Sequence, residues 1–184
     1  MQAAAALMTQ RGAAGTSIDA VRHAASVSGS QITHHFPTKQ SLVRAVIVWQ
    51  TDLVLQVLPG FQQGFTTLGE LETWASRVVT EYNTGSVANT YLLGRLAAEL
   101  AETDSEVRID LAVAFDRCFD CLATGIRGMR DRGEMRPDAD PDELAITLLS
   151  VVEGGTLLAR TNHDVRLLET PLLSTLDRIR SLMA

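Results

Sequence analysis

The 184-residue sequence predicts an all-α protein with a short N-terminal helix-turn-helix domain followed by a larger helical domain. Apolar residues recur at intervals of three and four along every periodic segment, which is the spacing of an amphipathic helix. No segment alternates apolar and polar β-branched residues between turn signals, as a half-buried strand would. No internal repeat or low-complexity tract interrupts the pattern, so helices account for the whole expected architecture.

The first expected helix covers the alanine-rich opening MQAAAALMTQR and ends at Gly12. This opening has neither the basic flank nor the cleavable apolar core of a secretory signal peptide, so we do not expect export.

Two short helices joined by a tight turn are expected next, between residues 16 and 37. Thr16 or Ser17 can cap the first of them with a side-chain oxygen. Ser28, followed three residues later by Gln31, forms the capping-box pattern that begins the second. Pro37 ends the second helix. A helix pair of this kind presents its second helix outward, which suits insertion into a DNA major groove.

The run RG-x(4)-S-I-x(2)-V-x(2)-A-A-x-V-S-x(5)-HHF-P-T-K resembles the DNA-binding signature of TetR-type transcriptional regulators. The likeness covers about the first 50 residues closely and the remainder by its helical layout. It implies that the second short helix reads base edges and that a lysine at the start of the next helix binds a phosphate. The residues that we expect to contact DNA are Ser28, Ser30, Gln31, Thr33, His34, Lys39 and Arg44.

Three features depart from the pattern of that family. Ser26 stands where the turn usually carries glycine, so its backbone is expected to adopt a conformation that glycine or asparagine favours. Thr33 replaces a tyrosine that commonly touches phosphate. The chain also opens inside the first helix, without the basic arm that normally precedes it, so we expect its DNA affinity to be weaker than is usual in that family.

The distribution of charge supports a separate DNA-binding domain. The formal net charge is −6, yet residues 1–50 carry four basic residues against Asp19 alone, a balance of +3. The other 134 residues hold 12 basic and 21 acidic groups, a balance of −9. A basic N-terminal domain joined to an acidic body is typical of a DNA-binding protein with a separate sensing domain. Random variation of the surface is the alternative.

A long helix from Ser41 to about Leu58 follows, and Pro59-Gly60 breaks it. Further helices are expected over 68–82, over 90–101, and from a cap at Thr103 or Asp104 to about Gly133. We therefore predict a helix-turn-helix domain over 1–45 and a ligand-binding and dimerisation domain over 46–184.

Two amphipathic helices end the chain. Asp140 caps the first, which contains Gly154-Gly155, and the second is expected to start near Thr170-Pro171. These helices suit a dimer interface of four helices, two from each subunit, and the TetR resemblance implies the same arrangement. A bundle within one chain is the alternative. The expected interface residues are Ile146, Leu149, Val152, Gly155, Leu172, Leu176 and Ile179.

The acidic domain is expected to bind a small, largely apolar effector in a pocket between helices. Its aromatic and sulfur side chains are the candidates for that pocket, although for any single residue core packing is the favoured interpretation. The expected pocket residues are Trp49, Leu53, Phe61, Trp74, Tyr82, Asn89, Tyr91, Phe115, Cys118, Phe119 and Glu153.

The sequence gives little support for a metal site, for redox chemistry or for catalysis. Cys118 and Cys121 form a CxxC on the apolar side of a helix without further ligands nearby, which favours core packing over zinc or redox chemistry. His34 and His35 point about 100° apart on a helix, so one is expected to face DNA and the other to pack inward. We find no catalytic set, expect neither enzymatic activity nor a cofactor, and find no apolar run long enough to span a membrane.

With two cysteines and no disulfide framework, the sequence fits a reducing cytoplasm. The function that we expect is a dimeric, ligand-responsive repressor of transcription that binds a near-palindromic operator. A helical small-molecule-binding protein without regulatory DNA binding is the main alternative, and a helical enzyme is the second.

Overall fold

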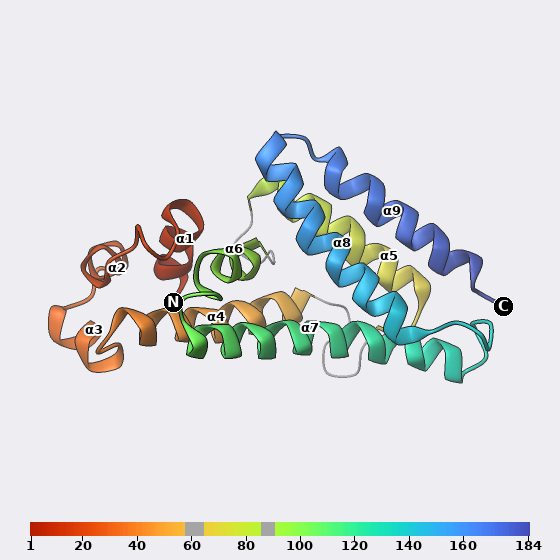
Figure 1. Cartoon of the computed structure of the whole chain (residues 1–184), viewed down its shortest axis with the longest axis horizontal. Coiled ribbons are helices and arrows are strands. Elements are labelled where there is room, and N and C mark those ends of the chain that lie inside the picture. The colour runs from red at the N-terminus through yellow and green to blue at the C-terminus, as the bar shows by residue number, and fades with distance from the viewer. Residues whose placement is uncertain (58–64, 86–90) are drawn as a thin grey trace. The chain divides into compact units, whose positions relative to one another are not determined.

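The computed structural model describes residues 1–57, 65–85 and 91–184, and within these ranges the chain forms helices and no strand beyond one isolated bridge (Figure 1). The predicted all-α fold is confirmed. The helices are α1 (Gln2–Arg11), α2 (Ile18–Ala25), α3 (Gly29–His35), α4 (Lys39–Val57), α5 (Leu68–Thr84), α6 (Tyr91–Leu100), α7 (Ser105–Asp131), α8 (Pro141–Asn162) and α9 (Arg166–Ser181).

The helices form two compact units. The first contains residues 1–53 and 90–115, and the second contains 54–89 and 116–184. The α4 and α7 helices each contribute residues to both units. The helix α6 and the start of α7 therefore pack with the N-terminal helices, whereas the sequence analysis assigned them to the second domain.

The core of the first unit is built from α1, α4, α6 and the start of α7. Met8, Val46 and Leu93 are fully buried there, and Ile32 of α3 is 6% exposed. These apolar positions recur at helical spacing, so each helix buries one side. The short helices α2 and α3 leave most of their remaining surface exposed.

The core of the second unit gathers buried residues from α5, α7, α8 and α9. Phe65, 2% exposed, packs so closely on α7 that a Cβ added to Gly125 would lie 2.6 Å from its ring. Gly125 is therefore a position where the absence of a side chain allows the close approach of an aromatic ring.

The predicted helix starts are partly confirmed. Asp104 caps α7 by accepting hydrogen bonds from the backbone N–H groups of Glu106 and Val107, both at 3.1 Å. Asp140 does the same for α8.

The predicted start of the last helix is wrong, because α9 begins at Arg166 and carries Pro171 inside it. The Asp164 side chain accepts a 3.0 Å bond from the Arg166 N–H and so supports the earlier start. Pro171 is the sixth residue of α9 and has no N–H to donate to the Leu167 carbonyl, so the helix continues through it with one backbone hydrogen bond fewer.

By length and composition, α8 is the one helix in the described ranges that passes a test for a membrane span, with a mean hydropathy of 1.3 over its best window. The sequence analysis found no such run. The core helix of a soluble protein passes the same test, and 39% of this window is buried, so the finding is weak support for a membrane location.

Candidate DNA-binding surface

The helices α2 and α3 form a helix-turn-helix whose two starts are capped by serines. Ser17 accepts a 3.1 Å hydrogen bond from the Ala20 N–H at the start of α2. At the start of α3, Ser28 Oγ accepts from the Gln31 N–H at 3.2 Å, and Gln31 Oε1 accepts from the Ser28 N–H at 3.0 Å. The predicted capping box is confirmed, and it fixes where α3 begins.

The turn between the two helices depends on Ser26, which adopts a left-handed conformation with φ 54° and ψ 39°. The conformation expected of this residue is confirmed. Its N–H binds the carbonyls of Arg22 and His23 and thereby closes the last turn of α2.

The outer side of α3 presents short polar side chains. The predicted base-reading residues Gln31, Thr33 and His34 are exposed, as are Ser28 and Ser30. Because Gln31 Oε1 already accepts the Ser28 N–H, a two-point contact of this amide with a base would break the capping box.

The expectation that one of the two neighbouring histidines packs inward is wrong. His35 is exposed like His34, and the two rings meet edge to face with centroids 5.3 Å apart. Ile32 takes the buried position of α3, and the partly buried Phe36 follows at its end. These two apolar side chains leave no inward position for His35.

The start of α4 lies next to this helix pair in the chain and carries Lys39 as its first residue. Thr38 and Ser41 cap the start by exchanging hydrogen bonds between their side chains and backbone N–H groups, at 3.0 and 3.2 Å. Lys39 is exposed, and its ammonium donates a 3.0 Å hydrogen bond to the carbonyl of Ala14. This cation at a helix N-terminus is well suited to a phosphate group.

Arg44 is engaged within the first unit. Its guanidinium donates to Asp110 at 2.5 Å and to Glu106 at 2.6 Å. The hydrogen bond that Arg44 donates to Asp110, together with the charge of this carboxylate, raises the pKa of Arg44 above its ordinary value. With two carboxylates on one guanidinium, Arg44 offers less charge to a phosphate than Lys39 does, and its predicted role in DNA binding remains a prediction.

The residues predicted to line a ligand pocket divide between the two units. Those in the first unit are Trp49, Leu53, Tyr91 and Phe115, and those in the second are Trp74, Tyr82, Cys118, Phe119 and Glu153. Phe61 and Asn89 lie outside the described residues.

Within the second unit, Trp74 and Cys118 are part of the core cluster, and Phe119 packs against it. The Tyr82 ring lies 5.3 Å from the guanidinium carbon of Arg160.

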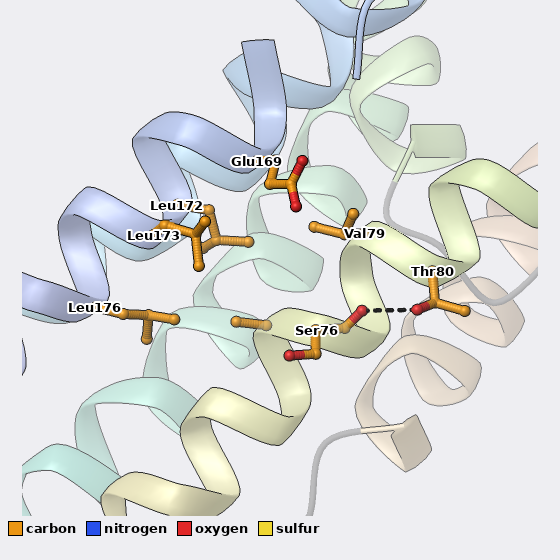
Figure 2. A pocket seen from close by; sticks show the side chains of 8 residues that line it. Ser76, Val79, Thr80, Glu169, Leu172, Leu173 and Leu176 are labelled. Carbon is orange, nitrogen blue, oxygen red and sulfur yellow. Dashed lines mark hydrogen bonds between the residues drawn. The ribbon is translucent and has the colours of Figure 1, made fainter. Parts of the chain in front are cut away.

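A cavity of about 230 Å³ lies between α5 and α9 in the second unit (Figure 2). None of the residues predicted from the sequence to line a ligand pocket lines this cavity. Its walls are mostly apolar, with two hydroxyl groups and one carboxylate, and they consist of Ala75, Ser76, Val79, Thr80, Glu169, Leu172, Leu173 and Leu176. This composition suits a small, largely apolar molecule.

The two cysteines are buried thiols, as the core-packing interpretation expects. Burial, followed by the charge of Glu153, raises the pKa of Cys118 to about 12, and burial also raises that of Cys121. A thiol whose pKa is raised reacts slowly because the thiolate is the nucleophile. Nowhere in the described ranges do three or more His, Cys, Asp or Glu side chains gather as a metal site requires.

Most of the predicted dimer-interface residues are already buried within one chain. Their exposed fractions are at most 4%, and they are Val152, Leu172, Leu176 and Ile179. Gly155 also faces its own chain, where an added Cβ would lie 3.0 Å from Leu168 Cα. Ile146 is 50% exposed and Leu149 is partly buried.

A second apolar face of α8 points outward instead. The exposed apolar residues on α8 and α9 are Ile146, Leu157, Leu158 and Leu173, with exposed fractions between 50 and 57%. Gly154 lies among them, and an added Cβ there would meet nothing within 4 Å. Exposed apolar side chains gathered on one helix face indicate an interaction surface.

The fold and the helix-turn-helix define the chain as having the architecture of a bacterial transcriptional regulator. The family model described as "Bacterial regulatory proteins, tetR family" matches residues 1–46, and that described as "Tetracyclin repressor-like, C-terminal domain" matches 70–172. The chain therefore belongs to the TetR family, whose members are generally DNA-binding proteins without enzymatic activity. A search among curated proteins found none that matches.

Solved structures of this family share the fold over nearly the whole chain. A TetR transcriptional regulator from Legionella pneumophila is 25% identical, with a TM-score of 0.77, over 97% of this chain and 94% of that one. A regulator from Chloroflexus aurantiacus J-10-FL is 23% identical, with a TM-score of 0.82, over 98% and 92% of the two chains. One from Cytophaga hutchinsonii is 22% identical, with a TM-score of 0.81, over 100% and 94%.

Proposed function

We propose that this protein is a ligand-responsive repressor that binds a near-palindromic operator as a homodimer in the cytoplasm and is released by a small, largely apolar effector. The observation that carries the proposal is the capped helix-turn-helix, with the exposed polar side of α3 followed directly by a cationic start of α4. The TetR family membership supports the same function.

In this proposal α3 enters the major groove, where Thr33 and His34 contact base edges and Ser28 and Ser30 approach the backbone. Gln31 joins them through its amide nitrogen, since its oxygen caps the helix. Lys39 binds a phosphate and supplies affinity that is independent of sequence.

The homodimer forms through the outward face of α8. Because the predicted interface residues are largely buried within the chain, we assign the interface to Ile146, Leu157 and Leu158. Two copies of this face would form an interface with twofold symmetry, and a twofold dimer offers one α3 helix to each half-site of a palindromic operator.

The effector site is the least defined part of the proposal. The cavity between α5 and α9 supports a small, largely apolar ligand, because leucine, valine and alanine form most of its walls. Release of DNA then requires that the effector bind more tightly to the free conformation of the protein than to the conformation bound to DNA.

A mobility-shift experiment with the DNA that flanks the coding region of this protein tests the function. We expect a shift that decreases with salt and is reversed by an extract of cell metabolites. Lys39→Ala should weaken binding to all sequences alike and reduce the salt slope by about one unit. An absence of salt-dependent binding to any duplex would favour the alternative, a ligand-binding protein without regulatory DNA binding.

A further inference from the structure

The turn between α1 and α2 is compact, and two of its positions have no room for a residue larger than glycine. Gly12 ends α1 with φ 76°, and an added Cβ at Gly15 would lie 2.5 Å from the Arg11 carbonyl oxygen. The Thr16 hydroxyl donates a 2.8 Å hydrogen bond to the carbonyl of Gly12. The two residues between the glycines are Ala13 and Ala14. Their backbone N–H groups bind a partner from outside the turn.

That partner is the carboxylate of Glu99 on α6, which lies beside α1 (Figure 1). Glu99 accepts a 2.8 Å hydrogen bond from the Ala13 N–H through one oxygen and a second bond from the Ala14 N–H through the other. One turn earlier on α6, Arg95 donates a 2.7 Å bond to the carbonyl of Thr9. Two charged residues of α6 therefore hold the end of α1 and the turn that follows it.

The contact leaves no space for a side chain between the turn and α6. A Cβ built on Gly12 would lie 2.7 Å from Glu99 Oε2 and 3.2 Å from Arg95 Nη2. Glycine at position 12 therefore leaves room for the Glu99 carboxylate to approach the backbone of the turn.

Ala14 is bound on two sides. Its N–H is held by Glu99, and its carbonyl accepts the 3.0 Å hydrogen bond from the Lys39 ammonium. The orientation of the Ala14 backbone therefore determines where the Lys39 ammonium rests. Lysine has a long, flexible side chain, and fixing it before binding removes part of the entropy cost of ordering it against DNA.

We propose that Glu99 is a positioning residue for Lys39, acting through the backbone of Ala14 to hold the ammonium ready for a DNA phosphate. The inference rests on the proposed phosphate contact of Lys39. One of the three N–H donors of the ammonium is used by Ala14, and the others remain available to phosphate oxygens.

The direction in which one substitution changes the affinity for DNA separates this role from simple electrostatics. Removing a negative charge near a DNA-binding surface strengthens attraction to DNA when only long-range charge matters. Glu99→Gln should instead weaken binding about fivefold, because only one terminal atom of the amide is an acceptor, so one of the two backbone N–H groups faces an NH2 group and the charge-assisted pair of bonds is lost. Glu99→Asp keeps the charge but is shorter by one methylene group, so it should weaken binding to a similar extent. Glu102→Gln, at an exposed position near the end of α6, is the matched control and should bind as tightly as the parent or more tightly.

Affinity is measured by fluorescence anisotropy of a short mixed-sequence duplex between about 50 and 200 mM salt. Circular dichroism checks that each variant retains the helix content of the parent. The deciding measurement is a double-mutant cycle with Lys39→Ala, because coupling of the two residues is not expected from a purely structural role. If Glu99 acts through Lys39, adding Glu99→Gln to Lys39→Ala should cause little further loss.

Three results overturn the inference. In the first, Lys39→Ala reduces the salt slope, but the losses of DNA affinity from the two substitutions multiply in the double variant. This result would refute the positioning role and leave the phosphate contact intact. A salt slope unchanged by Lys39→Ala would refute the phosphate contact itself and, with it, the role of Glu99. Binding by Glu99→Gln that equals that of Glu102→Gln would likewise overturn the inference.

Discussion

Replacing Ser26 by glycine should stabilise the protein, because the turn of the helix-turn-helix holds this serine in a left-handed conformation. A residue with a Cβ pays about 1–2 kcal/mol for that conformation, and glycine does not. Glycine loses more chain entropy on folding, which offsets roughly 0.5–1 kcal/mol of the gain. The Ser26 side chain is exposed, so little packing is lost. We expect a net increase of about 0.5–1 kcal/mol in the free energy of unfolding.

The assay is urea unfolding followed by circular dichroism, at one protein concentration because a dimer gains stability with concentration. The midpoint should rise with an unchanged slope, and the thermal midpoint should rise by about 1–4 °C. His163→Gly tests the same reasoning at the end of α8, where φ is also 54°. Ser174→Gly is the control within α9 and should lower stability by roughly 0.5 kcal/mol. A Ser26→Gly variant no more stable than the parent would refute the argument.

Three further predictions concern the second unit and the dimer. Leu157→Glu should weaken self-association at least about thirtyfold in sedimentation, since two half-exposed leucines are lost per dimer, whereas Ile109→Glu on α7, 53% exposed, should not. Gly125→Ala should cost about 1–3 kcal/mol in urea unfolding because of the Phe65 ring, while Gly128→Ala, which meets only the end of a flexible arginine, should be neutral or stabilising. The pKa of Cys118, raised to about 12 by burial, means that the folded chain keeps a proton that the unfolded chain loses above about pH 9. The stability from this thiol is complete below about pH 9 and declines as the pH rises towards 12, so the parent should lose up to about 1 kcal/mol per pH unit more than Cys118→Ala. Equal pH dependence of the two proteins would contradict this assignment.

Local features of the fold could be predicted from the sequence because their causes lie within a few residues. The capping box of Ser28 with Gln31, the cap of Asp140 and the conformation of Ser26 each follow from neighbours in the chain. The helical periods likewise follow from the spacing of apolar residues.

The contacts that position the candidate site could not be predicted in the same way. Arg44 and Asp110 are 66 residues apart in the sequence, and Ala14 and Glu99 are 85 residues apart. No local sequence pattern therefore predicts either hydrogen bond. The early start of α9 does not follow from the sequence pattern, because a proline usually marks the first turn of a helix, whereas Pro171 is the sixth residue of α9.

The sequence pattern does not separate the two sides of α8, because both are apolar. Periodicity identifies an apolar stripe but does not say whether it faces the core of its own chain or another molecule. Val152 is buried in its own chain, whereas Leu157, five residues later, is 57% exposed.

The two adjacent glycines of α8 are oriented towards different neighbours. A methyl group at Gly155 would press on the backbone of Leu168 in the same subunit, while one at Gly154 would project into open space. Alanine at Gly155 should therefore lower the melting temperature of the isolated subunit, whereas alanine at Gly154 should leave that temperature unchanged or raise it while altering how closely two subunits of the proposed dimer approach. A single peptide bond thus separates a position that governs folding from one that would govern pairing in the proposed dimer, and randomising both together would conceal the difference.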